Sequence, residues 1–404
     1  MLDFSIIGCG AAGNKAVAQL VAKGYSKDKC YYVNSTSVDL PAECDKEHTI
    51  IFGAQSKLTF GGCGKERSIG KRMIIEDMRS DTSAFDKICG NEHAIVLCGS
   101  TEGGSGSASL PILAKYFHEV HHKPVIVILF FGFKDDVRGL QNSIEICQEL
   151  SEDYGIVGID NAGFLDDNNG NRFKAEQAAN EQFCKVIKIL SGGVINNGQQ
   201  VIDDTDLYKV VTTPGYMIAD GTKLPDRIKT VEAYTNTLNN FLLNNAAYID
   251  PPKGSGCRRI AAIFNLREID DNINYSADAV SAIYGQPYEY FISTGGMIDN
   301  CNSFYFIASG MKFPIDRIQG IFDEYKARSE SVDKSKDSFF GHVNELRGAI
   351  EDAQFNMLGG SQQDEAQTTA AKKDFFGSLG ISDFSGTGGK TFATGMISQE
   401  TDEY

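Results

Sequence analysis

The sequence predicts an α/β protein with an N-terminal doubly wound parallel sheet and a smaller C-terminal α/β domain with a mixed sheet. First, short apolar runs alternate with helical patterns through the first half of the chain, as in parallel βαβ units. Second, two of these runs end in glycine-rich turns. Third, a new group of strand patterns begins at Ile260. A chain of 404 residues is long enough for two hydrophobic cores.

Six candidate strands in the first half are short and apolar enough to lie buried in a sheet. They are Asp3–Ile7, Cys30–Val33, His48–Phe52, His93–Cys98, Pro124–Phe131 and Gly155–Ile159. Helical patterns follow the first and the fourth, and Gly24 ends the first helix. Ligands of such sheets bind at the carboxyl ends of the strands, so the loops there form the candidate site.

A long helix is predicted over Lys174–Leu190, because its apolar residues recur at helical spacing. The second region should contain one helix, three strands and two charged helices. In order, these are Pro225–Ala247, Ile260–Leu266, Tyr288–Thr294, Phe304–Ser309, Ile315–Ser331 and Phe339–Leu358. From Gly359 onward the chain is rich in Gly, Ser, Thr and Asp, which predicts a flexible tail.

Composition narrows the classes of partner. The net charge of −16 argues against direct contact with nucleic acid, whose phosphates would repel the chain. Ten cysteines without a C-x-x-C pair indicate reduced thiols, and their spacing and that of the six histidines predict no metal site. No apolar run is long enough to span a membrane, and the first strand begins too near Met1 for a signal peptide. We therefore expect a cytoplasmic protein without a membrane partner.

The two glycine-rich turns are candidate phosphate loops. The first is Gly8-Cys9-Gly10-Ala11-Ala12-Gly13, and the second is Glu102-Gly103-Gly104-Ser105-Gly106-Ser107. A backbone without Cβ atoms approaches a phosphate closely and points N–H groups at it. The first turn alone fits an NAD-binding fingerprint, and an NAD-dependent oxidoreductase is one interpretation. That interpretation requires an acidic residue at the end of the second strand, where this chain has Asn34. It also does not explain the second glycine-rich turn.

The second turn resembles the signature loop of the tubulin/FtsZ superfamily of filament-forming GTPases. That signature reads small-Gly-Gly-Thr-Gly-small-Gly, and Glu102–Ala108 lies in register with it. The chain departs from it at Glu102, at Ser105 and at Ala108. This divergence favours the plasmid- and phage-borne branch known as TubZ.

Other loops match the family in order along the chain, and the resemblance implies GTP or GDP as the ligand, with Mg²⁺. Asn14 ends the first phosphate loop, Asn34 follows the second strand, and Asp135 or Asp136 with Arg138 lies beside the ribose. The Asn161 and Asn180 amides would contact guanine. The implied nucleotide-binding residues are Gly8, Cys9, Gly10, Ala11, Gly13, Asn14, Asn34, Gly61, Gly62, Gly64, Lys65, Gly103, Gly104, Ser105, Gly106, Ser107, Asp135, Arg138, Asn161 and Asn180. Glu102 beside a phosphate either points away or reaches a cation.

The acidic run at Asp203, Asp204 and Asp206 resembles the catalytic loop of the family. In the family, this loop enters the nucleotide pocket of the next subunit, where its carboxylates orient the attacking water. Without the resemblance, a solvated turn or helix cap is the simpler interpretation. Which of the three carboxylates is essential stays open.

The resemblance therefore implies a GTPase that polymerises head-to-tail and segregates plasmid or phage DNA. A basic DNA-binding adaptor would dock on the acidic tail. An FtsZ-type division protein and a non-hydrolysing relative are further alternatives. The expected units are a GTPase domain (1–173), a central helix (174–193), a catalytic loop region (194–213), a second domain (214–312), C-terminal helices (313–358) and a flexible acidic tail (359–404).

Overall fold

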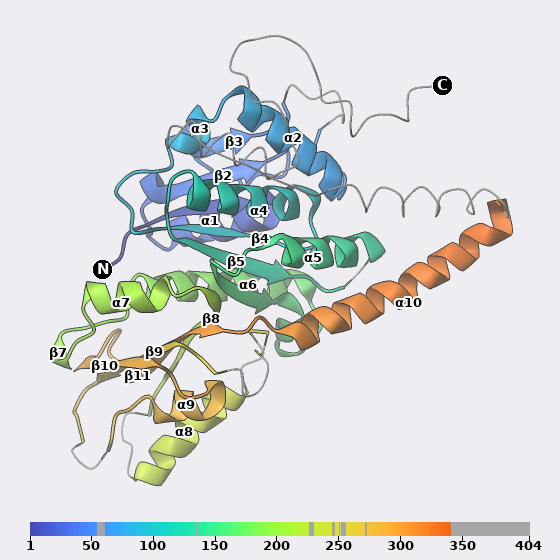
Figure 1. The fold of residues 1–404 in the computed structure, drawn as a ribbon. Coiled ribbons are helices and arrows are strands. Elements are labelled where there is room, and N and C mark those ends of the chain that lie inside the picture. The colour runs from blue at the N-terminus through green and yellow to red at the C-terminus, as the bar shows by residue number, and fades with distance from the viewer. Residues whose placement is uncertain are drawn as a thin grey trace.

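A computed structural model of the chain describes residues 1–54, 61–134, 136–225, 230–244, 247–249, 251, 256–270 and 273–340. Figure 1 shows a sheet that runs through the whole molecule, with helices on its faces. The eleven strands have the order β3-β2-β1-β4-β5-β6-β8-β11-β9-β10-β7. The expected tail, residues 359–404, and residues 341–358 lie outside the described residues.

Six parallel strands form the N-terminal part of the sheet. They are β1 (Phe4–Cys9), β2 (Cys30–Asn34), β3 (Thr49–Ile51), β4 (Ala94–Ser100), β5 (Val125–Phe131) and β6 (Gly155–Asp160). All six predicted strands are confirmed to within three residues at each end. Every residue of β5 is buried, as its continuous apolar sequence predicts. Because the chain leaves β1 first toward β2 and later toward β4, the sheet is doubly wound.

Helices connect these strands and cover both faces of the sheet. They are α1 (Gly10–Ala22), α2 (Arg67–Ser80), α3 (Ser83–Asp86), α4 (Gly104–Glu119), α5 (Val137–Glu149) and α6 (Arg172–Leu190), with the short 3-10 turns η1 (Lys27–Lys29), η2 (Lys46–His48), η3 (Asn161–Phe164) and η4 (Asp166–Asn168). Right-handed crossovers place α1 on the face opposite α4 and α5. Helix α1 begins directly after β1, and α4 begins after the short turn that follows β4, so both N-termini open at the carboxyl edge of the sheet.

The C-terminal strands form a mixed sheet, as predicted, but this sheet is continuous with the first. Its strands are β7 (Gly198–Gln200), β8 (Gly215–Lys223), β9 (Arg259–Leu266), β10 (Glu289–Gly296) and β11 (Ser303–Met311). The junction is a short parallel pairing of β6 with β8, at Gly155 with Gly215 and at Ile156 with Tyr216. Sequence analysis missed β8, because its apolar start is followed by the polar run Asp220–Lys223. It also missed the exposed strand β7.

The helices of the C-terminal part are α7 (Asp204–Val211), α8 (Val231–Leu243), α9 (Asp278–Tyr284) and α10 (Ile315–Phe340). The helix expected over Pro225–Ala247 is shorter, because Thr230 caps α8 by accepting the Ala233 N–H at 3.1 Å. The expected break after Ser331 was wrong: α10 continues to Phe340, since residues 332–338 contain neither Pro nor Gly. Within the described residues, no helix is both long and apolar enough to cross a membrane.

Candidate nucleotide-binding site and aspartate cluster

The two glycine turns meet at the carboxyl edge of the sheet. Strands β1 and β4 pair in parallel with Cys9 opposite Gly99, so both turns leave the same edge. A Cβ atom on Gly10 would lie 2.7 Å from the backbone nitrogen of Gly106, and one on Gly106 would lie 2.6 Å from the carbonyl oxygen of Cys9. Real Cβ atoms do not approach backbone this closely, so the contact requires glycine on both sides.

The first turn encloses a buried asparagine. Asn14 is fully buried, and its Nδ2 donates to the carbonyl of Val33 at 3.3 Å, while no described group hydrogen-bonds its Oδ1. This Oδ1 faces Gly8, where a Cβ atom would lie 2.7 Å from it. Burial raises the pKa of the Cys9 thiol to about 12, so that thiol is neutral and serves as a small apolar residue.

The loop after β2 touches the second glycine turn. The Ser35 and Ser105 hydroxyl oxygens are 2.5 Å apart. Asn34 donates from Nδ2 to the Asp39 carboxylate at 2.8 Å and accepts the Ser35 N–H. Strand β2 therefore ends in a buried amide rather than in the carboxylate that a dinucleotide site would use.

The third loop, residues 61–65, lies against the same turn. Gly61, Gly62, Gly64 and Lys65 all have positive φ angles, of 129°, 72°, 56° and 66°. A Cβ atom on Gly104 would lie 2.9 Å from the Cα of Lys65, so the two loops are in direct contact. Three loops that follow three different strands thus converge on Ser105 and its neighbours.

The turn after β5 brings charged groups to this edge. Asp136 caps α5 by accepting the Gly139 N–H at 2.7 Å, and it pairs with the ammonium of Lys65. Burial opposes ionisation of Asp136, but these hydrogen bonds outweigh it and lower the pKa of the carboxyl. Arg138 pairs with Glu66 at 2.9 Å. The other candidate ribose contact, Asp135, lies outside the described residues.

The two asparagines expected at guanine lie on neighbouring elements. Asn161 begins η3, and its buried Oδ1 has no described hydrogen-bond partner. Asn180 is half-buried on α6, which packs on η3. Asp160 fixes the start of η3 by accepting the Ala162 N–H at 3.1 Å, and Arg317 of α10 donates to the same carboxylate at 2.9 Å.

Sequence analysis missed two side chains that support these loops. Arg67 is buried at the start of α2, donates to the carbonyl of Ser107 at 3.1 Å, and pairs with Glu145 and Glu149 of α5. Asn142 donates to two backbone carbonyls, those of Lys65 at 3.0 Å and Glu102 at 3.1 Å. Neither belongs to a motif, and an arginine at the start of a helix is ordinarily exposed, so the sequence carries no signal for either role.

The aspartate cluster lies at the opposite edge of the sheet from these loops. Asp203 caps α7 by accepting the Asp206 N–H at 2.8 Å, and Asp204 pairs with the amino group of Met1 at 2.8 Å. Asp206 pairs with Lys209 at 3.3 Å. Met1 precedes the six-residue strand β1, and the first glycine turn follows it. At about 3.3 Å per residue, β1 alone separates the two sites by about 20 Å.

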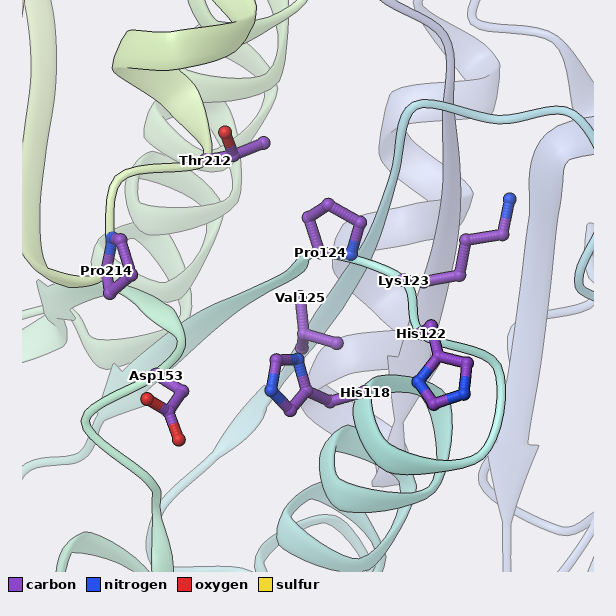
Figure 2. A pocket seen from close by; sticks show the side chains of 8 residues that line it. All are labelled: His118, His122, Lys123, Pro124, Val125, Asp153, Thr212 and Pro214. Atoms are coloured by element: carbon purple, nitrogen blue, oxygen red, sulfur yellow. The ribbon is translucent and has the colours of Figure 1, made fainter. Parts of the chain in front are cut away.

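The amino edge around the cluster is hollowed. One hollow of about 470 Å³ is lined by Glu92, His93, Lys123, Pro124, Asp204, Thr205 and Tyr208. A second, of about 350 Å³, shares Lys123 and Pro124 with it. Figure 2 shows the second hollow between the end of α4, the start of β5 and the Thr212–Pro214 segment after α7. Asp204 of the aspartate cluster therefore lines a hollow at this edge.

Residues 4–169 match the family described as "Tubulin/FtsZ family, GTPase domain". This segment is a domain of the Tubulin/FtsZ GTPase type. The match covers the six parallel strands and the candidate loops up to Asn161. The description of that family is of a GTPase domain, so GTP or GDP is the ligand that the match implies for these residues. The resemblance inferred from the glycine turns is confirmed.

Relatives and solved structures extend the Tubulin/FtsZ likeness beyond this domain. The cell division protein FtsZ 1 of Methanocaldococcus jannaschii is 26% identical over 245 residues, which is 59% of this chain and 65% of that protein, just under two thirds of its length. The GDP-bound monomer of CetZ1 from Haloferax volcanii superposes with a TM-score of 0.62 at 17% identity, covering 81% of this chain and 100% of that one. A GTPγS-form protofilament of TubZ from Bacillus thuringiensis serovar israelensis gives a TM-score of 0.66 at 12% identity, covering 83% and 94%. The part of the chain that these structures cover therefore has a tubulin/FtsZ-like α/β fold.

Proposed function

We propose that the protein is a GTPase that polymerises head-to-tail, and that GTP hydrolysis is completed by the aspartate cluster of the adjacent subunit. The observation that supports this most directly is the placement of the two candidate sites at opposite edges of one sheet. Asp204 pairs with Met1 at the amino edge, whereas the glycine turns lie beyond the other end of β1. A second copy stacked on the nucleotide edge would bring its own aspartates to the γ-phosphate. Such a contact is heterologous and non-closing, so it builds filaments.

In this proposal the three converging loops hold the phosphates through backbone N–H groups and the N-termini of α1 and α4. The Ser105 hydroxyl, which contacts the hydroxyl of Ser35, would donate to a phosphate oxygen. The Asn161 Oδ1, buried without a described partner, is an available acceptor for a guanine N–H. Lys65 and Arg138 are cations at the same edge, and each is at present paired with a carboxylate.

We further propose Mg²⁺ as the companion of the nucleotide, which would neutralise charge on the phosphates. Mg²⁺ prefers phosphate and water oxygens with one or two carboxylates. The chain fits this need: Asp39 offers an exposed carboxylate that Asn34 holds at 2.8 Å, on the loop that reaches Ser105. Asp204 and Asp206 of the next copy would orient the attacking water and accept its proton.

The test combines sedimentation with GTP turnover as a function of protein concentration. Turnover per subunit should rise steeply above the concentration at which filaments form. The double variant Asp204→Ala/Asp206→Ala should still sediment with GTP, but turn over about a hundredfold less. Asp28→Ala, which removes an exposed carboxylate from η1 at the same edge, is the matched control and should behave as wild type. Full-speed turnover in a dilute, unassembled sample would refute the proposal.

We propose that the filaments segregate plasmid or phage DNA in the cytoplasm, through a basic DNA-binding adaptor on the tail at 359–404. Similarity to TubZ and the net charge of −16, which opposes direct DNA contact, support this role. Removing residues 359–404 should abolish co-sedimentation with such an adaptor and preserve GTP turnover. Loss of turnover with adaptor binding retained would contradict it. The similarity to FtsZ 1 of Methanocaldococcus jannaschii favours cell division as the second candidate role.

A further inference from the structure

Glu102 places a carboxylate at the start of the second glycine turn, where a phosphate is expected. Its side chain turns away from that turn. One carboxylate oxygen accepts the backbone N–H of Lys134 at 3.0 Å, in the segment that follows β5. Its backbone carbonyl accepts from Asn142 Nδ2 at 3.1 Å. Both the side chain and the backbone of Glu102 are therefore held by residues that follow β5.

Two glycines leave the space that this carboxylate occupies. A Cβ atom on Gly132 would fall inside the Glu102 carboxylate, and one on Gly139 would lie 3.2 Å from the Glu102 Cβ. Gly132 does not have a positive φ, so its backbone conformation would accept alanine. Gly132 is thus needed for the room it leaves, not for its conformational freedom. The Glu102 side chain is therefore closely packed against two glycines that follow β5.

The backbone that Glu102 holds is an unusual one. Lys134 has a φ of 60°, which a residue with a side chain seldom adopts. Its N–H is bound by Glu102 and its carbonyl accepts from Arg328 of α10 at 2.8 Å. Two residues later, Asp136 caps α5 and pairs with Lys65. The Glu102 contact therefore fixes the backbone at Lys134, two residues before Asp136 on the expected ribose side of the site.

We propose that Glu102 is a positioning residue that ties the phosphate turn to the segment after β5, so that the phosphate and ribose sides of the site are held in register. This inference rests on the proposed nucleotide site. The reverse placement, with the carboxylate toward a phosphate, would add repulsion between like charges. The role of Glu102 is to act as a hydrogen-bond acceptor through the positions of Lys134 and Asp136, without touching the nucleotide.

The test is a double-mutant cycle on the full chain, with affinities for GDP and for 2′,3′-dideoxy-GDP measured below the assembly concentration. Glu102→Ala should weaken GDP binding about tenfold, as expected for loss of one hydrogen bond to a charged acceptor. It should weaken dideoxy-GDP binding much less, because the ribose contacts are the ones misplaced. Gly132→Ala, which displaces the same carboxylate, should do the same. The double variant should be no worse than either single one.

Glu102→Gln keeps an acceptor oxygen at the same reach and should retain GDP affinity within about threefold. A uniform loss for both nucleotides, or additive effects of the two substitutions, would overturn the inference and leave only a general structural role. The two levels of the proposal fail differently. If the wild-type chain binds neither nucleotide, the proposed function itself falls. If it binds GDP and Glu102→Ala leaves the ratio of the two affinities unchanged, only the positioning role falls.

Discussion

Individual glycines in the second turn are required for different reasons. Gly106 is crowded by the protein itself, since its Cβ would lie 2.6 Å from the Cys9 carbonyl oxygen. Gly103 has extended backbone, with φ of −76°, and no described atom lies within 4 Å of its would-be Cβ. Glycine is required at position 106 because the two turns meet there. No described atom requires glycine at position 103, so we attribute a requirement there to a bound ligand. The two requirements are separable by experiment.

The pair Gly106→Ala and Gly103→Ala should therefore divide stability from binding. Gly106→Ala forces the two turns apart and should lower the free energy of unfolding of the nucleotide-free chain by about 2 kcal/mol, as overpacking does. Gly103→Ala should lower it by clearly less, about 0.5 to 1 kcal/mol, because alanine is a poorer N-cap for α4 than glycine but its methyl group meets no described atom. It should weaken GDP binding nonetheless, because its methyl group stands where a phosphate approaches the backbone. Urea denaturation and nucleotide titration check the two halves. A stability loss in Gly103→Ala as large as that in Gly106→Ala would contradict this division.

Arg67 joins the second turn to α5 through an ion pair in which the arginine is buried and the glutamate is partly exposed. The Arg67 side chain is 3% exposed, whereas Glu149 is 33% exposed. Burial raises the pKa of Glu149, but the hydrogen bonds and charges of Arg67 and Lys71 outweigh it, so the folded pKa lies below its ordinary value. A lowered carboxyl pKa stabilises the fold above the unfolded pKa of about 4.3. That contribution disappears as the pH falls through the lower, folded value.

Arg67→Met should lower the free energy of unfolding near neutral pH by about 2 kcal/mol, less than for a fully buried pair because solvent screens the carboxylates. The difference from wild type should shrink as the pH is lowered from about 6 toward about 3.5. Denaturation curves across this range measure it. Lys71→Met, which removes the more exposed partner of Glu149, is the control and should lose clearly less. A difference that stays constant with pH would show that Arg67 acts by packing alone.

Among the elements, α10 connects the C-terminal part of the chain to the nucleotide edge. Figure 1 shows it running across the molecule past α5, on which it packs. Arg317 and Arg328 are eleven positions apart, about three helical turns, and so lie on one face. Arg317 reaches Asp160 beside Asn161, and Arg328 reaches the Lys134 carbonyl. One helix face thus touches the segments on the expected base side and ribose side.

We expect Arg317→Gln to loosen η3, since Asp160 would lose a partner that is 16% exposed and gain only a neutral donor. Amide hydrogen exchange over Asn161–Phe164 should accelerate about tenfold, and GDP affinity should fall several-fold. The matched variant Arg328→Gln should leave exchange in η3 unchanged, because its contact is with Lys134. Equal acceleration in both variants would mean that α10 acts on the fold as a whole rather than through separate contacts.

The parallel strands could be predicted from sequence because each is a buried apolar run whose interpretation needs no partner, as in β5. The glycine turns were recognisable because each places several glycines directly after an apolar run, a pattern that is visible without any tertiary contact. The supporting contacts could not be predicted. Arg67 meets Glu149 across 82 positions, and Glu102 meets Lys134 across 32, so their roles exist only after folding. The strand β8 was missed for a similar reason, since its polar end Asp220–Lys223 becomes a strand by pairing with β11.

At the scale of the whole molecule, the decisive feature is the division of the proposed chemistry between two edges of one sheet. The carboxyl edge carries the candidate phosphate turns, and the amino edge carries Asp204 beside a hollow. A single copy carries both halves of the proposed site, but β1 keeps its own aspartates away from its own nucleotide edge. Two copies stacked head-to-tail would form one complete site at their junction, and each further copy in the filament would add one more. Turnover would then report the number of junctions rather than of molecules.

Two variants that are each inactive should therefore form an active mixture. Gly103→Asp should fold, since the position is open and aspartate is a favoured N-cap for α4, but its carboxylate should repel a phosphate and prevent GTP binding. Asp204→Ala/Asp206→Ala should bind GTP and lack the carboxylates. Mixed together, the first supplies aspartates to the nucleotide of the second. GTP turnover should exceed the sum of the separate samples and should be greatest near equal proportions of the two variants, falling toward zero as either one dominates. Gly103→Asp that also carries Asp204→Ala/Asp206→Ala is the control and should restore nothing. If the mixture of Gly103→Asp with Asp204→Ala/Asp206→Ala shows no more GTP turnover than this control, the reactive centre is not shared between copies.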